Sequence, residues 1–319
     1  MLYLGVDLGG TNIKAALVNE AGEILHEGSR PTNLPRPAEA VCDDIAALCL
    51  GLIDEAGCGK AEVGGIGVGC PGTVDDATGM VRYSNNLAWE NFPMGEYLHQ
   101  KTGLRVRLGN DANVAALGET IAGCAKGADS AVVITLGTGV GGGVVLDGKM
   151  LVGHSGAASE LGHMVLNAAK DAPLCTCGRR GCFEVYSSAT ALIRMTREAM
   201  AAHPESLMHQ ISAQGGVNGK TAFDAKEAGD PAGTAVVEQY IHWLAVGVAN
   251  IINVFFPQVI GLSGGVANQG DNLLVPLRKE VEPMVFGHDF ADPAKMTRIV
   301  CCTLGYRAGV IGAALLAKD

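Results

Sequence analysis

The sequence predicts an α/β fold with two similar lobes, and two observations support this. First, stretches with the pattern of strands alternate with stretches that have helical spacing, as in α/β domains. Second, residues 2–25 and residues 131–153 each read as a strand, a glycine turn and a strand. In this weak repeat Leu8-Gly9 corresponds to Leu136-Gly137, 128 positions later. Two half-chains that open with the same unit indicate two lobes of one design.

The other elements follow from spacing and from helix and turn signals. Between the repeated blocks, Val41, Ile45, Leu48 and Leu52 recur at helical spacing. The sequence predicts helices in 37–57, 112–123, 233–257 and 306–319, and strands in 104–111 and 297–305. Within 63–75 it predicts a buried strand followed by a Pro-Gly turn, and within 258–267 a strand that runs into a glycine turn. Asp111 is expected to start the second helix and Pro257 to stop the third. We expect a smaller lobe over 1–119, rejoined by the C-terminal stretch 304–319, and a larger lobe over 120–303.

Composition excludes several classes of protein. The 319 residues suffice for two domains, and 45 glycines without a repeat period indicate tight turns and close backbone approaches. A net charge of -10 argues against nucleic acid as a partner. We expect no membrane span, because no run of eighteen apolar residues occurs. The start, "MLYLGVDLGG", lacks the features of a secretory signal, so the expected location is cytoplasmic.

Ten cysteines in a reducing compartment are not expected to form a disulfide framework. Cys42, Cys49 and Cys302 lie in apolar stretches and are interpreted as small core residues, and the adjacent Cys301 and Cys302 as two buried thiols on a strand. The stretch "LCTCGRRGCFEVYSS" (174–188) differs, since its three cysteines lie in a polar, glycine-rich loop. A metal site and a chance cluster are the readings left open at this point.

Three glycine patterns look like nucleotide motifs but lie in the wrong context. Two fit the dinucleotide fingerprint, which requires a strand followed by a helix, and one nearly makes a P-loop. They are Gly137/Gly139/Gly142, Gly67/Gly69/Gly72 and Gly143/Gly148/Lys149. The first is followed by a strand, the second by a loop, and the third has Met150 in place of Ser or Thr. We reject all three.

"DLGGTNIK" and "LGTGVGGG" are better interpreted as paired phosphate-binding hairpins. Glycine removes the side-chain obstacle, so that backbone amides can approach phosphate oxygens. The amides concerned are those of Gly9, Gly10 and Thr11, and those of Thr138 and Gly139. Asp7 ends the first strand, where it can hold hydrated Mg²⁺. Either hairpin alone could be a plain turn; their recurrence in both halves favours a shared nucleotide.

These motifs resemble the ROK family (repressors, open reading frames, kinases) of the actin-like, hexokinase-type ATPases. The resemblance covers essentially the whole chain, in the order "DLGGTNIK", "GCPGTVD", "GNDANVAALGE", "LGTGVGGG", "SELGHMVL", "CTCGRRGCFE" and "LSGGVA". It implies two ribonuclease-H-like lobes, ATP and Mg²⁺, and transfer of a phosphoryl group to a hexose or amino sugar. It adds Asn12, Lys14, Gly264 and Gly265 to the nucleotide site, and a homodimer or homotetramer as the assembly.

The resemblance also assigns the sugar site. Asp111 would by position alone be an ordinary helix N-cap; the family's Asn-Asp pair makes it the general base, with Asn110 binding the sugar. Glu160, His163 and Glu184 are implied to contact the sugar. The loop "CPG", through Gly72, is expected on its other side.

The same resemblance bears on the cysteine loop. His163, Cys175, Cys177 and Cys182 offer one imidazole and three thiolates, a plausible closed set for one structural Zn²⁺. The metal would fix His163 directly and Glu184 through the nearby Cys182. We therefore expect a brace for the sugar pocket.

The leading hypothesis is an ATP-dependent kinase that converts glucose to glucose 6-phosphate, with ATP bridging the lobes as they close. Alternatives within the family are kinases for N-acetylmannosamine, N-acetylglucosamine, fructose or allose. A sugar-sensing regulator without catalysis is a further alternative, and a dinucleotide enzyme is a distant third. A repressor is not expected, because too few residues precede Asp7 to build a DNA-binding segment.

Overall fold

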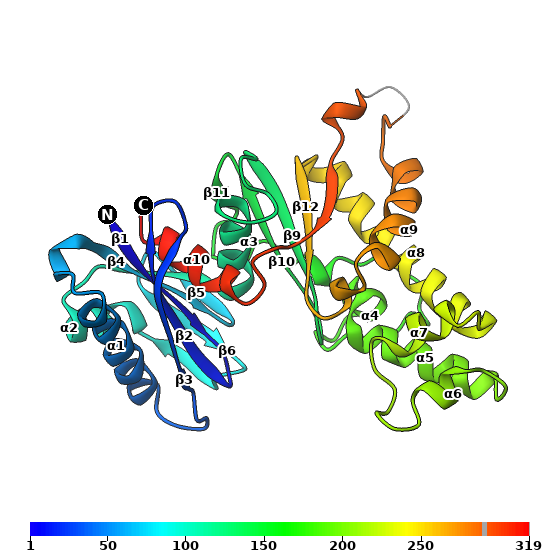
Figure 1. Cartoon of the computed structure of the whole chain (residues 1–319), viewed down its shortest axis with the longest axis horizontal. Helices are drawn as coiled ribbons and strands as arrows, with labels where there is room; N and C mark the ends of the chain where they lie inside the picture. The colour runs from blue at the N-terminus through cyan, green and yellow to red at the C-terminus, as the bar shows by residue number, and fades with distance from the viewer. Residues whose placement is uncertain (289–291, 319) are drawn as a thin grey trace. The chain divides into compact units, whose positions relative to one another are not determined.

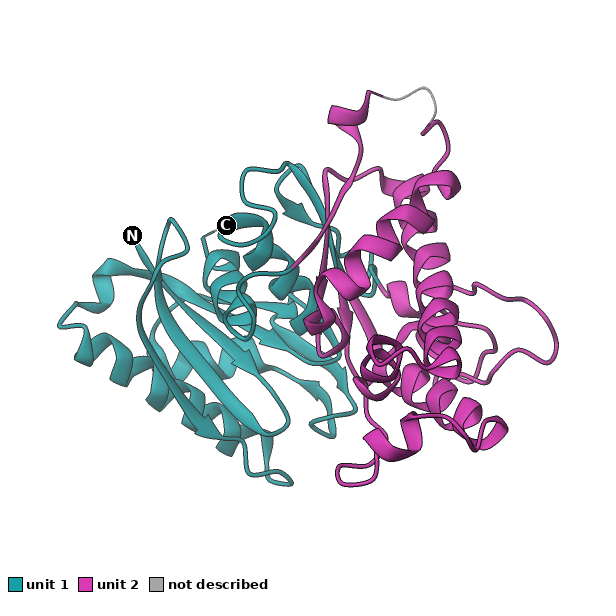
Figure 2. Cartoon of the chain, turned by 45° about the vertical axis from the view of Figure 1, so that its right-hand side comes forward, with its two compact units in different colours: residues 1–133, 143–159, 302–319 teal, residues 134–142, 160–301 magenta. Residues whose placement is uncertain are grey.

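The computed structural model describes residues 1–288 and 292–318 (Figure 1). The chain forms two compact units (Figure 2). Unit 1 comprises Met1–Val133, Gly143–Ser159 and Cys302–Asp319, and unit 2 comprises Ile134–Gly142 and Glu160–Cys301. The chain thus passes between the units four times, and the sequence placed the first crossing at 119/120.

Unit 1 contains a five-stranded sheet in the order β3-β2-β1-β4-β8. Its strands are β1 (Leu2–Leu8), β2 (Asn12–Asn19), β3 (Ile24–Pro31), β4 (Val63–Cys70) and β8 (Val106–Asn110). β1, β4 and β8 are parallel, and the register aligns Asp7 with Gly69 and Cys70 with Asn110. The carboxyl ends of three strands therefore lie on one edge of the sheet, where α/β proteins place their ligands.

Helices cover both faces of this sheet. Alternate residues of a strand point to opposite faces, so Leu4 and Val6 join the core beneath α1 (Ala38–Glu55) and α2 (Met94–Thr102). Tyr3 instead packs with α10 (Arg307–Leu316), on the other face. The neighbour of α10 is α3 (Asp111–Ile121), which follows β8 directly and carries the predicted base as its first residue.

Glycine brings α10 to within backbone contact of the sheet and of α3. A Cβ atom added at Gly67 would lie 1.7 Å from the carbonyl oxygen of Ala313, and one added at Gly312 would lie 1.6 Å from that of Val114. Likewise, a Cβ atom added at Gly5 would lie 1.8 Å, and one added at Gly118 would lie 2.2 Å, from a carbonyl oxygen of α10. Atoms cannot approach so closely, so only glycine fits.

The second sheet repeats the order of the first. Its order is β11-β10-β9-β12-β13, with β9 (Ser130–Leu136), β10 (Val140–Leu146), β11 (Lys149–Met150), β12 (Val259–Ser263) and β13 (Arg298–Cys301). β9 and β10 begin 128 residues after β1 and β2. The structure confirms the internal repeat. It also confirms that the three rejected nucleotide motifs lie in strands and their turns.

The helices predicted at the ends of the two halves are present, and several elements were not predicted. The longest helix is α8 (Pro231–Phe255), capped by Asp230 and ended by Phe256 in a left-handed conformation just before Pro257. Unpredicted in unit 1 are α2 and a three-stranded sheet of β5 (Thr73–Asp75), β6 (Met80–Ser84) and β7 (Trp89–Phe92). Unpredicted in unit 2 are α4 (Glu184–Ser187), α5 (Ala189–Ala202), α6 (Met208–Ile211), α7 (Thr221–Glu227) and α9 (Asp271–Val281).

By length and composition alone, α8 is apolar enough to cross a membrane. However, 61% of its apolar window is buried in the structure, as in the core helix of a globular unit. Its buried side chains include Val237, Tyr240 and Leu244.

Some of the cysteines predicted to be buried core residues are buried, and others are not. Cys42 and Cys49 are fully buried core residues, as predicted. Cys301 and Cys302 are only half-buried, and Cys302 lies outside β13, which ends at Cys301. The interpretation of these two as buried strand thiols was wrong. Cys302 belongs to the turn that leads into α10, where Cys124 lies close to it.

We predict that Gly67→Ala lowers the free energy of unfolding by about 3 kcal/mol or more, because its Cβ would overlap Ala313. Gly51→Ala is the matched control, since Gly51 lies in α1 with open space around its Cβ position. That variant should gain up to about 1 kcal/mol from helix propensity. Urea unfolding followed by circular dichroism measures both, and equal effects would contradict the packing argument.

Candidate functional site

Two carboxylates meet at the edge of the first sheet. Asp7 lies in β1, one residue before its end, and Asp111 is the first residue of α3. Burial is the main cause that raises the pKa of Asp7; the Lys14 ammonium lowers it and the charge of Asp111 raises it. Burial also raises the pKa of Asp111, against the backbone amide of Ala112, which lowers it. A carboxylate held above its usual pKa is a better proton acceptor than an exposed one.

The structure confirms that α3 starts at Asp111, and it places the N-cap one residue earlier. Asn110 is the N-cap, because its side-chain oxygen accepts from the amides of Ala112 at 3.0 Å and Asn113 at 3.3 Å. Its Nδ2 donates to the carbonyl oxygen of Gly72 at 3.0 Å, which ties the "CPG" loop to the helix start. Asp111 therefore follows the cap instead of forming it. Asp111 Oδ1 also accepts from the amide of Ala112 at 2.9 Å, but Asn110 alone bonds the amide of Asn113 and occupies the N-cap position.

The first glycine hairpin joins β1 to β2. The amide of Gly9 donates to the carbonyl oxygen of Asn12 at 3.0 Å. Thr32 supports the hairpin from outside: its hydroxyl donates to the carbonyl oxygen of Gly9 at 2.7 Å and its amide to that of Thr11 at 2.8 Å. Gly10, Thr11 and Asn12 are exposed. The turn is thus fixed in shape while its outer residues remain accessible.

Lys14 follows this hairpin on β2, opposite Asp7 in the register of the sheet. Its ammonium lies 5.3 Å from the centre of the Tyr306 ring, a cation–π contact. A cation beside a carboxylate and beside a glycine turn is electrostatically suited to an anionic ligand.

The second hairpin, in unit 2, is held in a comparable way. The amide of Gly137 donates to the carbonyl oxygen of Gly139 at 3.0 Å. From the start of α5, the amide of Ala189 donates to the carbonyl oxygen of Gly137 at 2.8 Å, and the hydroxyl of Thr190 to that of Thr138 at 2.7 Å. Thr138 itself is exposed.

Gly264 lies beside this hairpin. Its φ is +88°, and a Cβ there would lie 2.5 Å from the carbonyl oxygen of Leu136. The hydroxyls of Ser263 and Thr135 are 3.3 Å apart, so the ends of β12 and β9 lie together. Gly265 is exposed, with open space at its Cβ position. The predicted nucleotide residues of unit 2 are therefore adjacent to one another.

Glu184 links the second hairpin to the cysteine loop. One oxygen, Oε2, accepts from the amide of Val140 at 3.0 Å; the other, Oε1, accepts from the hydroxyl of Thr176 at 3.2 Å and the thiol of Cys175 at 3.6 Å. A Cβ at Gly139 would lie 2.3 Å from Oε2. The Glu184 carboxylate thus occupies the space that a side chain at Gly139 would take.

Glu160 and His163 bracket a single 3₁₀ turn, Leu161–His163, with Glu160 at its N-cap. The turn packs tightly on β10, since a Cβ at Gly162 would lie 2.0 Å from the carbonyl oxygen of Val140. Glu160 is exposed and His163 half-buried. Both sugar-binding candidates are therefore carried on a turn that glycine anchors to the sheet.

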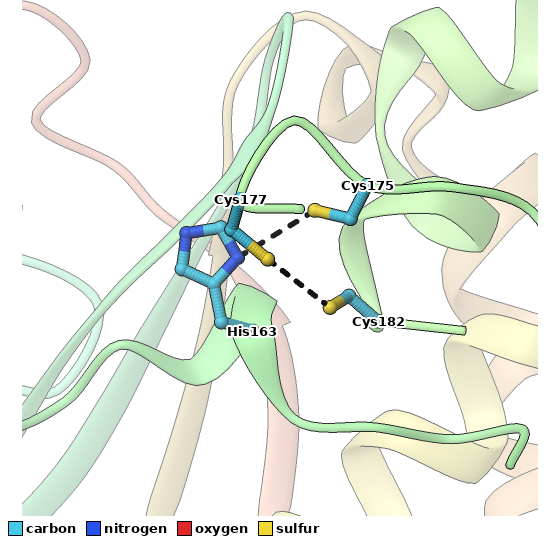
Figure 3. Close-up of side chains that lie close together, drawn as sticks. All are labelled: His163, Cys175, Cys177 and Cys182. Carbon is cyan, nitrogen blue, oxygen red and sulfur yellow. Dashed lines mark hydrogen bonds between the residues drawn. The ribbon is translucent and has the colours of Figure 1, made fainter. Parts of the chain in front are cut away.

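His163, Cys175, Cys177 and Cys182 converge (Figure 3), with all four candidate ligand atoms within 4.8 Å of one another. Nδ1 of His163 is 3.8 Å from Sγ of Cys175, and Sγ of Cys177 is 3.7 Å from Sγ of Cys182. Ligands about 2.0–2.3 Å from a tetrahedral Zn²⁺ lie about 3.6–3.8 Å from each other. The donor set and the spacing both fit one structural zinc ion.

The thiols of this cluster differ in acidity. The backbone amide of Arg179 is the main cause that lowers the pKa of the exposed Cys177 to about 6. Burial raises the pKa of Cys182 to about 12. Of these two thiols, Cys177 more readily supplies a thiolate, which is the form that binds metal.

A cavity of about 1000 Å³ opens beside Asn110 within unit 1. Thr73, Asn113 and the stretch 148–156 contribute to its lining. Asn113 is only 3% exposed, and its side-chain Oδ1 is buried without a hydrogen-bond partner. Asn110, a predicted sugar ligand, lines this cavity together with Asn113, which is consistent with a site for a polar molecule.

Sequence reasoning missed the residues that hold the site in place. Thr32 and Thr190 donate to the backbone of the two hairpins from positions outside the motifs, and Thr176, inside the cysteine motif, donates to Glu184. Gly309 lies against Asp7, with its Cβ position 3.0 Å from the carboxyl carbon. The small residues of "AGVIGAA" at helical spacing were the one available signal for this contact.

Comparison with known proteins gives the same family over the full chain. The ROK family model matches residues 3–319. The chain is 38% identical over 318 residues to a glucokinase of Halalkalibacterium halodurans, covering 99% of this chain and 95% of the relative. Among solved structures, it is similar to a Streptomyces griseus ROK family glucokinase in complex with glucose and AMPPNP (34% identity, TM-score 0.77, 100% of this chain and 99% of that one). It is also similar to a Thermus thermophilus ROK hexokinase (34% identity, TM-score 0.82, 100% and 98%).

The matching order of motifs, the repeated sheets and these similarities agree. The two-lobed fold expected from the sequence is that of the ROK hexokinases and glucokinases. The chain belongs to the ROK family.

Proposed function

We propose that the protein is an ATP-dependent sugar kinase that phosphorylates the primary hydroxyl of glucose. The observation that carries the proposal is the buried Asp111 carboxylate at the edge of the sheet, with a raised pKa and a helix cap already supplied by Asn110. The glucokinase and hexokinase relatives support the choice of substrate.

In this proposal Asp111 accepts the proton of the sugar hydroxyl as that oxygen attacks the γ-phosphate of ATP. Asp7 would hold the Mg²⁺ that neutralises phosphate charge. The carboxylate is a hard oxygen ligand, as Mg²⁺ requires. Burial raises the pKa of Asp7, and a bound cation would act against this by favouring the ionised form. Lys14 adds positive charge on the neighbouring strand.

The amides of the two hairpins would bind phosphate oxygens. They belong to Gly10, Thr11, Thr138 and Gly139, while the amide of Gly9 closes the first turn on Asn12. Asn12 would lie beside the phosphates, and Gly264 and Gly265 would border the adenosine. Support comes from the fixed hydrogen bonds at the base of each turn and the exposure of its outer residues. Such preorganised donors act without rearrangement when the phosphoryl group is transferred.

Sugar hydroxyls would be bound by Asn110, Glu160, His163 and Glu184, with Gly72 at the loop edge. The second hydrogen of Asn110 Nδ2 is available, because the first bonds Gly72. Glu184 already accepts bonds from its own unit, which fixes the direction of its carboxylate.

We further propose that Zn²⁺ bound by His163, Cys175, Cys177 and Cys182 is structural. The four ligands fill a tetrahedral shell and leave no open position for catalysis. Because Cys175 and Thr176 contact Glu184, an ordered loop would hold this carboxylate in place.

The runner-up substrates are N-acetylmannosamine, N-acetylglucosamine, fructose and allose, since the same residues can bind any of them. A sugar-sensing regulator would not need the raised pKa of Asp111.

We also propose that the protein is cytoplasmic and forms a homo-oligomer. Two exposed apolar residues near the end of α8 support the assembly. Val254 is 72% exposed and Phe286 is 90% exposed, and Asn253 bonds the amide of Phe286.

We predict that Asp111→Ala lowers kcat with glucose and ATP at least about a hundredfold, because the proton acceptor is lost, while glucose binding largely persists. A coupled ADP-release assay and calorimetric titration with glucose measure the two quantities. Asp54→Ala, which removes an exposed carboxylate from α1, is the control and should behave as wild type.

The pH dependence tests the same role. The base must be ionised, so the wild-type kcat/KM should fall as the pH falls through the pKa of Asp111, which lies above the usual 3.8. For the variant described above, near-normal turnover of Asp111→Ala would contradict the role of Asp111 as general base.

We predict that removal of zinc weakens glucose binding at least about tenfold, because the loop beside Glu184 loses its metal crosslinks. Zinc content is checked by elemental analysis before and after chelation, and the Kd for glucose is measured in each state. Cys58→Ser, which alters a half-buried thiol far from this loop in sequence, should keep both zinc and affinity. Unchanged glucose affinity in verified zinc-free protein would contradict the brace.

A further inference from the structure

A second cluster of metal- or redox-capable side chains lies in unit 1, outside the proposed catalytic machinery. Glu119, Cys124 and Cys302 bring a carboxylate oxygen and two sulfur atoms within 4.8 Å of one another. Sγ of Cys124 is 4.0 Å from Sγ of Cys302, although 178 positions separate the two cysteines. Both cysteine residues are half-buried, so neither is enclosed in the core.

The carboxylate of Glu119 fixes the two segments that carry these cysteines. Its Oε2 accepts from the amide of Cys124 at 2.9 Å and from that of Thr303, next to Cys302, at 3.2 Å. Its Oε1 accepts from the amide of Leu304 at 2.9 Å. Glu119 is 1% exposed, so these bonds are shielded from water. The carboxylate therefore holds both cysteine segments in one arrangement.

Gly123 makes this arrangement possible. A Cβ at this position would lie 2.0 Å from Oε2 of Glu119, so the carboxylate folds back across a residue without a side chain. The two thiols are therefore close because Glu119, packed against Gly123, bonds both segments that carry them within unit 1.

The chemistry of Glu119, Cys124 and Cys302 favours a redox-active pair of thiols over a metal site. Three backbone amides already satisfy the carboxylate oxygens, and a structural zinc site needs four ligands where this cluster has three groups. A disulfide requires sulfur atoms about 2.05 Å apart. Starting from 4.0 Å, each sulfur needs to move only about 1 Å, which rotation of the side chains can supply.

We propose that Cys124 and Cys302 form a thiol–disulfide exchange site for low-molecular-weight disulfides, and that closing it slows the enzyme. One thiolate attacks the reagent RSSR, forming a mixed disulfide and releasing RSH after proton uptake. The second cysteine then attacks the protein-bound sulfur and releases a second RSH. Two electrons pass from the dithiol to RSSR, and both thiol protons leave with the two RSH molecules.

The effect on turnover follows from where the chain is crosslinked. Cys302 is the first residue after the chain re-enters unit 1 from unit 2. Cys124 follows α3, which begins with Asp111. Movements between parts of a protein are absorbed by a few residues at such crossings, and kinases depend on conformational steps in each cycle. A covalent link here removes freedom from one crossing and anchors the far end of the helix that carries the base.

The test uses the zinc-loaded full chain and glutathione disulfide as the oxidant. After oxidation we expect a Cys124–Cys302 crosslinked peptide in non-reducing peptide mapping, with a mass lower by two hydrogens. The kcat for glucose should fall at least about threefold and recover with dithiothreitol. Cys124→Ser and Cys302→Ser should keep reduced wild-type kcat and lose the response, whereas the adjacent Cys301→Ser should respond like wild type.

Three outcomes would overturn the proposal: no such peptide, a crosslink that leaves kcat unchanged, or an extra equivalent of zinc that requires Cys124 and blocks oxidation. The kinetic readout rests on the proposed sugar kinase activity, but the mapped crosslink does not. Absence of any turnover in the reduced protein would therefore count against the proposed function, and the mapping would be judged separately.

Discussion

The site in unit 1 depends on backbone contact between helices and sheet. α10 lies so close to β1, β4 and α3 that Gly5, Gly67 and Gly312 have no room for a Cβ atom. The same approach places Gly309 against the carboxyl group of Asp7. Because α3 packs on α10 and starts at the sheet edge, its first residue, Asp111, comes near Asp7. Part of the high glycine content is therefore a requirement of the site.

In unit 2 a single carboxylate has the comparable role. Glu184 bonds the amide of Val140 at the second hairpin and the side chains of Cys175 and Thr176 in the cysteine loop. The proposed phosphate-binding turn, the proposed sugar ligand and the proposed zinc loop are thus connected by hydrogen bonds. A change in the loop is expected to be transmitted to the carboxylate, since Cys175 and Thr176 both bond its Oε1.

Local patterns predicted the elements that depend on local chemistry. The repeat located β9 and β10 from β1 and β2, because glycine turns and alternating strands are written in consecutive residues. The strands β5–β7 were missed because they are short and partly exposed. Asn110 was not recognised as the N-cap, since Asn and Asp are both good caps and stand side by side. The environment of Cys302 depends on Cys124, a partner far away in the chain that no local pattern reveals.

The most direct test of the account is a coupled ADP-release assay with ATP over matched low concentrations of several sugars, ranked by kcat/KM. The panel comprises glucose, N-acetylmannosamine, N-acetylglucosamine, fructose and allose. The account predicts that glucose has the highest kcat/KM. A higher value for an N-acetylated sugar would contradict the assigned substrate. Binding without turnover on every sugar would contradict the assignment of a kinase.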